Sequence, residues 1–403
     1  MAKPRQIFRG NLVLPDRVLV GGELIVDEGR FTAIREVPGG GQGQAEDAVV
    51  SDGYLAPGYI DLHVHGGAGA DFMDGTVDAV GRVLAAHLRH GTTGVLATTT
   101  AAAHEQILAT ITACGSHREH PRRGCARVLG VHLYGPYFRA EAKGCHPGGP
   151  IRPPMGAEYE QYLSSGVVVT ASVAPELPGA ESFVRTCLER GVRVGAGHTY
   201  ATFQQMAEAI RWGVRHVDHL YCAMSDRARL RLEKSYPMRG GVFEASLFFD
   251  ELTTEVIADG KHLSADLLLL ARKIKGADRL ALVTDCNRAL DMPDGEYIFG
   301  PLEGGVPFVR HDGVGLMPDR GALASSVRGM DHMVRTFVEM TGCPIWEAVR
   351  MASLTPARIA GCDRERGSIE VGKRADLLLL DRDLNVEQVF LDGAPQILSH
   401  DKH

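Results

Sequence analysis

The sequence lacks the features by which proteins engage membranes or nucleic acids. Its 403 residues carry 43 Lys and Arg against 50 Asp and Glu, a formal net charge of −7, and no block rich in Lys or Arg. A nucleic acid or an anionic membrane would require a basic surface to meet its phosphates. No stretch approaches the ~20 consecutive apolar residues of a membrane span. We therefore expect a small-molecule substrate, with no nucleic-acid and no membrane partner.

The sequence also lacks paired cysteines and an amino-terminal apolar segment. Its eight cysteines, at positions 114, 125, 145, 187, 222, 286, 343 and 362, include no Cys-x-x-Cys pair, which favours reduced thiols over a disulfide framework. The first residues lead directly into an alternating pattern, without the apolar region of a secretion signal. Both features predict a cytoplasmic protein.

Two kinds of pattern divide the chain. From residue 6 to 37, apolar and polar residues alternate between Gly-containing breaks, which predicts β-hairpins. From residue 57 onward, short apolar strands alternate with helical stretches, which is typical of βαβ units on a parallel sheet. The helical stretches include 78–90, 180–190, 202–212 and 265–275. A Gly- and Pro-rich stretch up to residue 321 predicts an inserted hairpin, followed by helices at 330–341 and 345–360 and strands at 375–380 and 386–391.

Eight strands are predicted in the alternating region, which is typical of a closed (β/α)8 TIM barrel whose active site lies at the carboxyl ends of the strands. They are Tyr59–His65, Thr93–Thr99, Val128–Tyr134, Val167–Val173, Val192–His198, His216–Tyr221, Glu255–Asp259 and Leu280–Asp285. Strands at both chain ends can bury their apolar faces against one another. We therefore predict an α/β protein with a barrel of residues 57–361 and a small β-sandwich domain built from residues 1–56 and 362–403.

Polar residues recur where the predicted barrel strands end. His63 and His65 are two apart in a strand, so their side chains point to the same face and can bind one ion together. His198, His219 and Asp285 come at or near the ends of later strands. Nitrogen and oxygen ligands at this density suit Zn²⁺ or a related divalent ion such as Fe, Mn, Co or Ni. Such an ion lowers the pKa of bound water from 15.7 toward ~7, and Asp285 is the natural carboxylate to handle the proton as general base and then general acid.

The order and spacing of several motifs resemble those of a known family. The segment Ala56–Gly66 is similar to the first-strand motif of the amidohydrolase superfamily, whose His-x-His pair binds metal. More specific segments resemble N-acetylglucosamine-6-phosphate deacetylase, namely Gly130–Tyr137, Lys143–His146, Val173–Glu176, Gly197–Thr199, Asp218–Met224, Ala258–His262 and Leu282–Asp285. The closing segments Ala352–Arg358 and Gly367–Asp376 also fit the superfamily.

The resemblance implies hydrolysis of a linear amide, namely deacetylation of N-acetylglucosamine-6-phosphate or a related N-acetyl amino sugar. It implies that His198 and His219 bind metal and that Asp285 is the catalytic acid and base. It also implies a homodimer, by analogy alone. Residues expected to contact the substrate are Cys145, His146, Cys222, Ala223, His262, Leu323, Ala324 and Ser325.

Four positions depart from the family pattern. Tyr134 stands where the family has a metal-binding Glu on strand three, and a phenol with a pKa of ~10 is a poorer ligand than a carboxylate unless the ion deprotonates it. Cys222 replaces an Asn, and Ser325 stands where Gly is usual. The segment 225–231 is rewritten, so Arg227, or else one of the arginines at 229 and 231, must supply the arginine expected to meet a sugar phosphate.

These departures leave other functions open. A deaminase of the same superfamily would hold a single ion with His63, His65, His198 and Asp285, and would not need a ligand at Tyr134. A catalytically silent sugar-phosphate-binding homologue would have kept the barrel and lost the chemistry. Two-ion amidases with a carboxylated lysine on strand four are disfavoured, because 167–176 contains no lysine. The His-x-His pair can compensate for the missing Glu at Tyr134. One ion then lies among His63, His65, His198 and Asp285, with His219 beside it.

Overall fold

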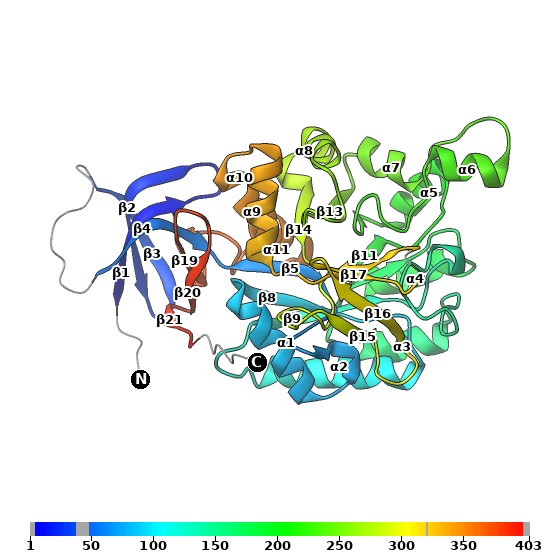
Figure 1. Ribbon diagram of the computed structural model, residues 1–403, viewed down its shortest axis with the longest axis horizontal. Helices are drawn as coiled ribbons and strands as arrows, with labels where there is room; N and C mark the ends of the chain where they lie inside the picture. The colour runs from blue at the N-terminus through cyan, green and yellow to red at the C-terminus, as the bar shows by residue number, and fades with distance from the viewer. Residues whose placement is uncertain (1–4, 38–47, 320, 398–403) are drawn as a thin grey trace.

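The computed structural model describes residues 5–37, 48–319 and 321–397 as a barrel with a smaller β-sheet at one side (Figure 1). Eight parallel strands form the barrel sheet and are hydrogen-bonded in chain order. They are β5 Tyr59–Val64, β8 Thr92–Thr98, β9 Arg127–Tyr134, β10 Val168–Val173, β11 Arg193–Ala196, β12 His216–Val217, β13 Thr253–Ile257 and β14 Leu280–Val283. All eight overlap the strands predicted from the sequence, so the predicted barrel is confirmed.

The barrel closes between its first and last strands. The backbone N–H of Asp285 donates to the carbonyl oxygen of His63 at 2.8 Å. The Thr284 hydroxyl donates to the buried carboxylate of Asp61 at 2.5 Å. Because both bonds join the end of β14 to β5, they also bring the predicted base beside the His-x-His pair.

Helices cover the outside of the barrel (Figure 1). They are α1 Val77–Arg89, α2 His104–Glu119, α3 Gly156–Ser164, α4 Ala180–Glu189, α5 Phe203–Trp212, α6 Arg227–Lys234, α7 Val242–Phe248, α8 Ala265–Arg279, α9 Met330–Thr341, α10 Ile345–Ala352 and α11 Leu354–Ala360, with short 3₁₀ helices η1 Phe72–Asp74 and η2 Ala140–Ala142. Helix α5 shows the local cause: the Thr202 hydroxyl accepts from Gln205 N, the Gln205 side chain accepts from Thr202 N, and Gly213 ends the helix at φ 119°.

The segment 345–360 differs from the single helix predicted. It is two helices, α10 and α11, that meet at Ser353, whose φ and ψ are −139° and −74°. Pro356 explains the break, because a proline inside a continuous helix has no N–H for the Ala352 carbonyl and its ring collides with that carbonyl. In the first turn of α11 the same proline is tolerated.

Strands from both ends of the chain form one seven-stranded mixed sheet, in the order β21-β20-β19-β4-β1-β2-β3. Their bounds are β1 Gln6–Val13, β2 Val18–Asp27, β3 Arg30–Glu36, β4 Ala48–Pro57, β19 Leu377–Leu380, β20 Val386–Leu391 and β21 Ala394–Pro395. Phe8 of β1 and Phe390 of β20 pack edge to face at 5.1 Å although two strands separate them in the sheet. The sheet therefore curls over its own core. The small β domain made from both ends is confirmed, and its boundaries at 56/57 and 361/362 stay a prediction.

The stretch after Asp285 is more than the hairpin predicted. It forms a four-stranded sheet of β15 Gly295–Phe299, β16 Val306–His311, β17 Val314–Leu316 and β18 Leu323–Ser326. A two-stranded ribbon, β6 Gly66–Gly67 and β7 Ala70–Asp71, follows the first barrel strand. Strand β18 returns to the barrel, where Ser326 N donates to the Asp285 carbonyl at 3.0 Å.

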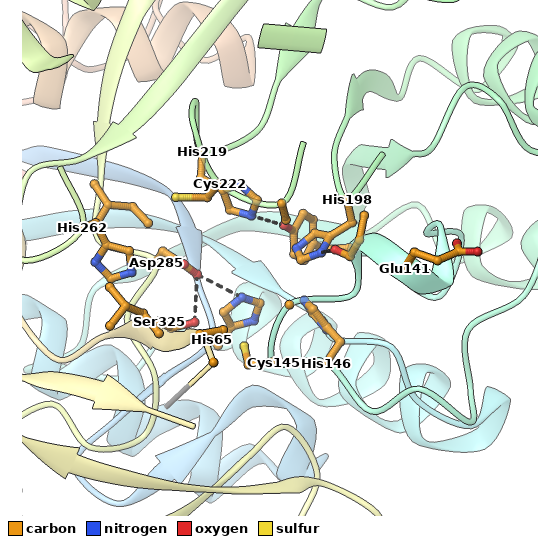
Figure 2. Close-up of a pocket in the computed structure, with 18 of the residues that line it drawn as sticks. His65, Glu141, Cys145, His146, His198, His219, Cys222, His262, Asp285 and Ser325 are labelled. Atoms are coloured by element: carbon orange, nitrogen blue, oxygen red, sulfur yellow. Dashed lines mark hydrogen bonds and ion pairs between the residues drawn. The ribbon is translucent and has the colours of Figure 1, made fainter. Parts of the chain in front are cut away.

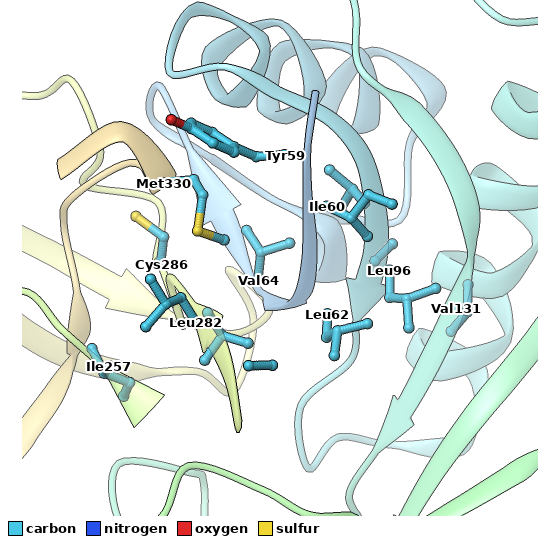
Figure 3. Packing of buried hydrophobic residues seen from close by; sticks show 14 of the residues in the cluster. Tyr59, Ile60, Leu62, Val64, Leu96, Val131, Ile257, Leu282, Cys286 and Met330 are labelled. Atoms are coloured by element: carbon cyan, nitrogen blue, oxygen red, sulfur yellow. The ribbon is translucent and has the colours of Figure 1, made fainter. Parts of the chain in front are cut away.

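One continuous apolar core fills the space inside the barrel and between its strands and helices. Leu62 and Leu96 lie close together in the barrel, and Met330 lies near Tyr59 of the first strand (Figure 3). No helix in the described part of the chain is long and apolar enough to cross a membrane. The eight cysteines, all within the described ranges, are free.

Candidate metal centre and substrate pocket

Three of the predicted metal residues converge at the end of the first and last barrel strands. His63 lies in β5, His65 follows it, and Asp285 follows β14. Asp285 Oδ1 lies 3.7 Å from His63 Nε2 and 3.3 Å from His65 Nε2. One ligand atom from each residue lies within 4.8 Å of the other two. This spacing can place all three around one divalent ion.

Glu255 of β13 fixes the orientation of His63. Its Oε1 lies 2.6 Å from His63 Nδ1, so that nitrogen donates its proton to the carboxylate. His63 Nε2 is buried and has no hydrogen-bond partner. An imidazole held in this way by a carboxylate presents its second nitrogen to a metal ion. The unpartnered Nε2 therefore fits the expected metal.

The sequence analysis missed Glu255. It assigned the residue to a barrel strand and gave it no role. A signal was present, because a carboxylate in a predicted barrel strand needs a partner when it is buried. Its partner was not apparent, since His63 is far away in the sequence.

Opposing charges set the protonation of the three-residue centre. Burial lowers the pKa of His63, but Glu255 and Asp285 outweigh it and raise the pKa to about 9. Burial lowers the pKa of His65. Burial raises the pKa of Asp285, but the hydrogen bond from His65 and the nearby histidines bring it well below its usual range. The two carboxylates thus favour positive charge between them, which either a proton or a metal ion supplies.

His198 and His219 face the same pocket but lie outside the three-residue cluster. His198 Nδ1 donates to the Ala142 carbonyl oxygen at 2.6 Å, which leaves its other nitrogen free of that bond. His219 Nε2 lies 2.5 Å from the Tyr134 hydroxyl. The two imidazole rings are 5.1 Å apart. Both remain candidate ligands at one side of the centre.

Tyr134 contacts two of the histidines: its hydroxyl reaches His219, and its ring centre lies 4.3 Å from that of His63. Burial, followed by the charges of Asp218 and Asp285, raises the pKa of its phenol well above the usual value. Burial and the charge of His63 lower the pKa of His219 to about 4. A protonated phenol and a neutral imidazole can share one hydrogen bond, which engages His219 Nε2 and leaves His219 Nδ1 without a hydrogen-bond partner.

A cavity of about 430 Å³ opens beside the centre, large enough for a sugar. Its lining includes His65, His198, His219, Asp285 and Tyr134, together with most of the predicted substrate residues (Figure 2). The predicted residues in the lining are Cys145, His146, Cys222, Ala223, His262, Leu323 and Ser325. Ala324 is fully buried behind the lining, and Arg227 does not reach it.

The ring of His262 is fixed by Asp259 in an orientation that suits a polar contact with a ligand in this pocket. Its Nδ1 donates to Asp259 Oδ2 at 2.8 Å, and the Asp259 carboxylate also accepts from the His262 backbone N–H at 2.8 Å. Burial lowers the pKa of His262, but Asp259 outweighs it and raises the pKa. The ring is therefore fixed in one orientation at the pocket wall.

Arg227, the first of the three arginines predicted to meet a phosphate, does not line the cavity. Arg227 has a side chain 65% exposed and pairs with Glu244 at 3.7 Å. Arg229 instead stacks on Tyr200, a pocket residue, with its guanidinium 4.4 Å from the ring centre. Arg139 lies over the same ring at 5.0 Å. Arg229 and Arg139 therefore both contact a residue of the pocket lining.

A parallel eight-stranded barrel with a His-x-His pair after the first strand and an Asp after the last defines a barrel hydrolase of the metal-dependent class. Residues 54–395 match the amidohydrolase family. The chain is 36% identical over 341 residues to N-acetylgalactosamine-6-phosphate deacetylase of Escherichia coli O157:H7, covering 84% of this chain and 86% of that protein. It is 32% identical over 371 residues to N-acetylglucosamine-6-phosphate deacetylase of Vibrio furnissii, covering 91% and 89%.

A solved structure extends the likeness over almost the whole chain. A variant of N-acetyl-D-glucosamine-6-phosphate deacetylase from Mycobacterium smegmatis, in complex with N-acetyl-D-glucosamine-6-phosphate, superposes with a TM-score of 0.88 at 28% identity, covering 98% of this chain and 99% of that chain. The chain therefore belongs to the amidohydrolase family, as an N-acetylglucosamine-6-phosphate deacetylase-like hydrolase of linear amides. The family resemblance predicted from the sequence is confirmed.

Proposed function

We propose that this chain deacetylates an N-acetylhexosamine 6-phosphate with one catalytic divalent ion, most simply Zn²⁺, held by His63, His65 and Asp285. His198 and His219 complete the side of the centre that faces the pocket. The observation that carries the proposal is the buried, unpartnered Nε2 of His63, aimed by Glu255 at the centre beside a sugar-sized cavity.

Asp285 is the residue that moves the proton. A divalent ion at this centre supplies a Lewis acid and lowers the pKa of water. The Asp285 side chain is 10% exposed, whereas those of His63 and His65 are 0% and 1% exposed, so it is the member of the trio with most access to the pocket. Its carboxylate accepts a proton from the attacking water and returns it to the leaving nitrogen. Ser325, 3.4 Å from Asp285 Oδ1, orients that carboxylate.

The substrate class is supported by the relatives and by the pocket rim. The relatives from Escherichia coli and Vibrio furnissii are named for N-acetylgalactosamine and N-acetylglucosamine 6-phosphates. Arg229 and Arg139, both within 5.0 Å of the Tyr200 ring centre, offer guanidinium groups that suit a phosphate. The wall of the cavity carries His146 and His262, which can bind sugar hydroxyls or the acetyl oxygen.

A panel of substrates tests this proposal. Chelator-treated chain is reloaded with Zn²⁺ and incubated with N-acetylglucosamine and N-acetylgalactosamine, each with and without a 6-phosphate. We expect metal-dependent acetate release with a lower KM for the phosphorylated sugars. Ammonia release from an aminated base without acetate release would indicate the deaminase alternative. Saturable binding of the sugars without any product would indicate a silent binding protein.

We also propose a homodimer. Large apolar side chains are exposed on and beside α6 and α7, with Leu232 84%, Tyr236 79% and Phe248 69% exposed. Exposed apolar groups in one region favour a protein interface. Light scattering after gel filtration should give twice the monomer mass, and Leu232→Asp together with Phe248→Asp should lower it. A wild-type monomer would refute the dimer.

A further inference from the structure

A second group of buried polar side chains lies inside the barrel, apart from the substrate pocket. It consists of His216, Asp218 and Glu255, and one ligand atom from each lies within 4.8 Å of the other two. All three line a small cavity. This cavity and the substrate pocket have no lining residue in common. The proposed reaction gives His216 and Asp218 no role.

The hydrogen bonds of His216 leave its Nε2 without a proton, facing the Glu255 carboxylate. The Thr253 hydroxyl uses its only proton to donate to the Arg215 carbonyl oxygen at 3.1 Å. Its oxygen can therefore only accept from His216 Nδ1, 2.8 Å away, so the proton of the ring is on Nδ1. With that proton on Nδ1, the neutral imidazole presents the lone pair of Nε2 to Glu255 Oε2 at 3.2 Å. Lone pairs repel at this distance, so a proton or a cation must lie between them.

The two oxygens of the Glu255 carboxylate have separate partners. Oε1 of Glu255 is engaged by His63 and by the backbone N–H of His219, at 2.6 and 3.1 Å. Oε2 is the oxygen that faces His216.

Asp218 adds a second carboxylate beside His216. Its side chain is fully buried, and neither carboxylate oxygen makes a hydrogen bond. Asp218 Oδ1 lies 4.0 Å from His216 Nε2. A buried ion without compensation costs on the order of several kcal/mol. The chain nevertheless keeps space for this carboxylate, because any side chain at Gly197 would collide with Asp218 Oδ2.

We propose that His216, Asp218 and Glu255 bind a second divalent transition-metal ion, which stabilises the barrel and does not take part in the reaction. One imidazole nitrogen and two carboxylates are the ligands that Zn²⁺, Mn²⁺ or Co²⁺ accept. Ca²⁺ takes about six to eight oxygen ligands, more than this group offers. The ion replaces the proton between His216 and Glu255 and compensates Asp218.

The cavity beside the three residues has the size and the access that an ion requires. Its volume is about 20 Å³, and a single water needs at least about 10–15 Å³. Four of its lining residues, Arg193, Val194, His216 and Ile359, also line a larger cavity of about 260 Å³. Arg193 and His216 are the first residues of β11 and β12, so this route leads to the end of the barrel opposite the substrate pocket.

Glu255 links the two metal sites. One of its oxygens accepts from His63 of the catalytic centre, and the other faces the second ion. An ion bound to Oε2 fixes the carboxylate that orients His63. Loss of the second ion should therefore weaken the catalytic ion, whereas loss of the catalytic ion should leave the second ion in place.

Metal counting on the full chain tests the second site. The chain is stripped with chelator, reloaded with excess Mn²⁺ or Zn²⁺, desalted and analysed by mass spectrometry of the metal. We expect two ions per chain in the wild type, one in Asp218→Asn and one in His65→Ala, whose remaining ion survives without acetate release. Asp78→Asn is the matched control, because Asp78 is 86% exposed on α1, and it should keep two ions.

Two results would overturn the second site. One is a wild type that binds a single ion at saturation, together with a His65→Ala variant that binds none. This result would mean that a proton lies between His216 and Glu255. The other is an Asp218→Asn variant that still holds two ions. If Asp218→Asn does not fold, anomalous diffraction from wild-type crystals soaked in Mn²⁺ decides. A peak bounded by His216, Asp218 and Glu255 supports the site, and its absence refutes it. Acetate release is measured separately, so failure of the second site is distinct from failure of the proposed reaction.

Discussion

The Glu255→Gln variant tests whether a buried carboxylate prepares His63 for the catalytic ion. The change keeps the volume of the side chain and removes its charge. Glu255 is 1% exposed, and its Oε1 accepts from His63 Nδ1 at 2.6 Å. Water cannot screen the loss. A glutamine can also turn its NH₂ group toward Nδ1, which would shift the proton of His63 to Nε2 and block the nitrogen that faces the ion.

The size of the effect follows from the bond that is lost. Removing the hydrogen-bonded partner of a metal-binding histidine lowers metal affinity about 10–100-fold. Each tenfold change is about 1.4 kcal/mol, so the expected loss is about 1.4–2.8 kcal/mol. A hydrogen bond to a charged group contributes about 1.5–3 kcal/mol, which is the same range. The agreement indicates that the single contact with His63 is enough to produce the loss.

The assay measures activation of metal-free chain by buffered Zn²⁺, with acetate release as the readout. We expect the free Zn²⁺ concentration for half-maximal activity to rise about 10–100-fold in Glu255→Gln, while turnover at saturating Zn²⁺ falls much less. Glu251→Gln is the matched control, because Glu251 is exposed just before the same strand. An unchanged half-activating concentration in Glu255→Gln would refute the role assigned to the carboxylate.

Three further predictions concern the base, the phosphate and the fold. Asp285→Asn should leave the circular dichroism spectrum unchanged and lower turnover about 10²–10⁴-fold; near-normal turnover would remove Asp285 from the mechanism. Arg229→Ala should raise KM for a phosphorylated sugar and spare the unphosphorylated one; equal effects on both would mean that no phosphate is read there. His90 lies between Asp291 and Asp331, at 2.9 and 3.0 Å. Burial lowers the pKa of His90, but the two carboxylates raise it to about 10. The stabilisation is complete below the unfolded pKa of ~6.5 and is lost as pH rises through about 10. The Tm difference between wild type and His90→Gln should therefore shrink from pH 6 to pH 10, and a constant difference would refute the charged clamp.

The barrel was predictable because its strands carry a strong local signal. Runs such as Leu280–Val283 are apolar throughout, as expected of parallel strands buried on both faces. The His-x-His pair was predictable for a similar reason, since two residues of one strand need no knowledge of distant partners. The two short helices at 345–360 and the extra strands after Asp285 were harder, because they depend on one proline and on pairing between weakly apolar segments.

The remaining parts of the site depend on which residues of separate segments meet. Glu255 acquires its role only when the barrel closes and leaves β14 alone between β13 and the strand of His63, and no local pattern gives that register. The sequence could not decide among the arginines at 227, 229 and 231 for a different reason. Arg227 and Arg229 lie in the same helix, α6, about 200° apart around its axis. Sequence alone gave neither the start of that helix nor the side that faces Tyr200.

The Tyr134→Phe variant tests whether the phenol of Tyr134 is a ligand of the catalytic ion. The Tyr134 hydroxyl lies 2.5 Å from His219 Nε2 and is engaged there by a hydrogen bond. Tyr134→Phe should therefore retain the catalytic ion, with an unchanged half-activating Zn²⁺ concentration. It should lower the free energy of unfolding by about 1–3 kcal/mol, because the buried His219 nitrogen loses its partner. The His63→Ala, His65→Ala double variant should lose catalytic-site activation by Zn²⁺ altogether. Release of the ion by Tyr134→Phe, together with its survival in the double variant, would place the metal on a phenolate and the later histidines instead.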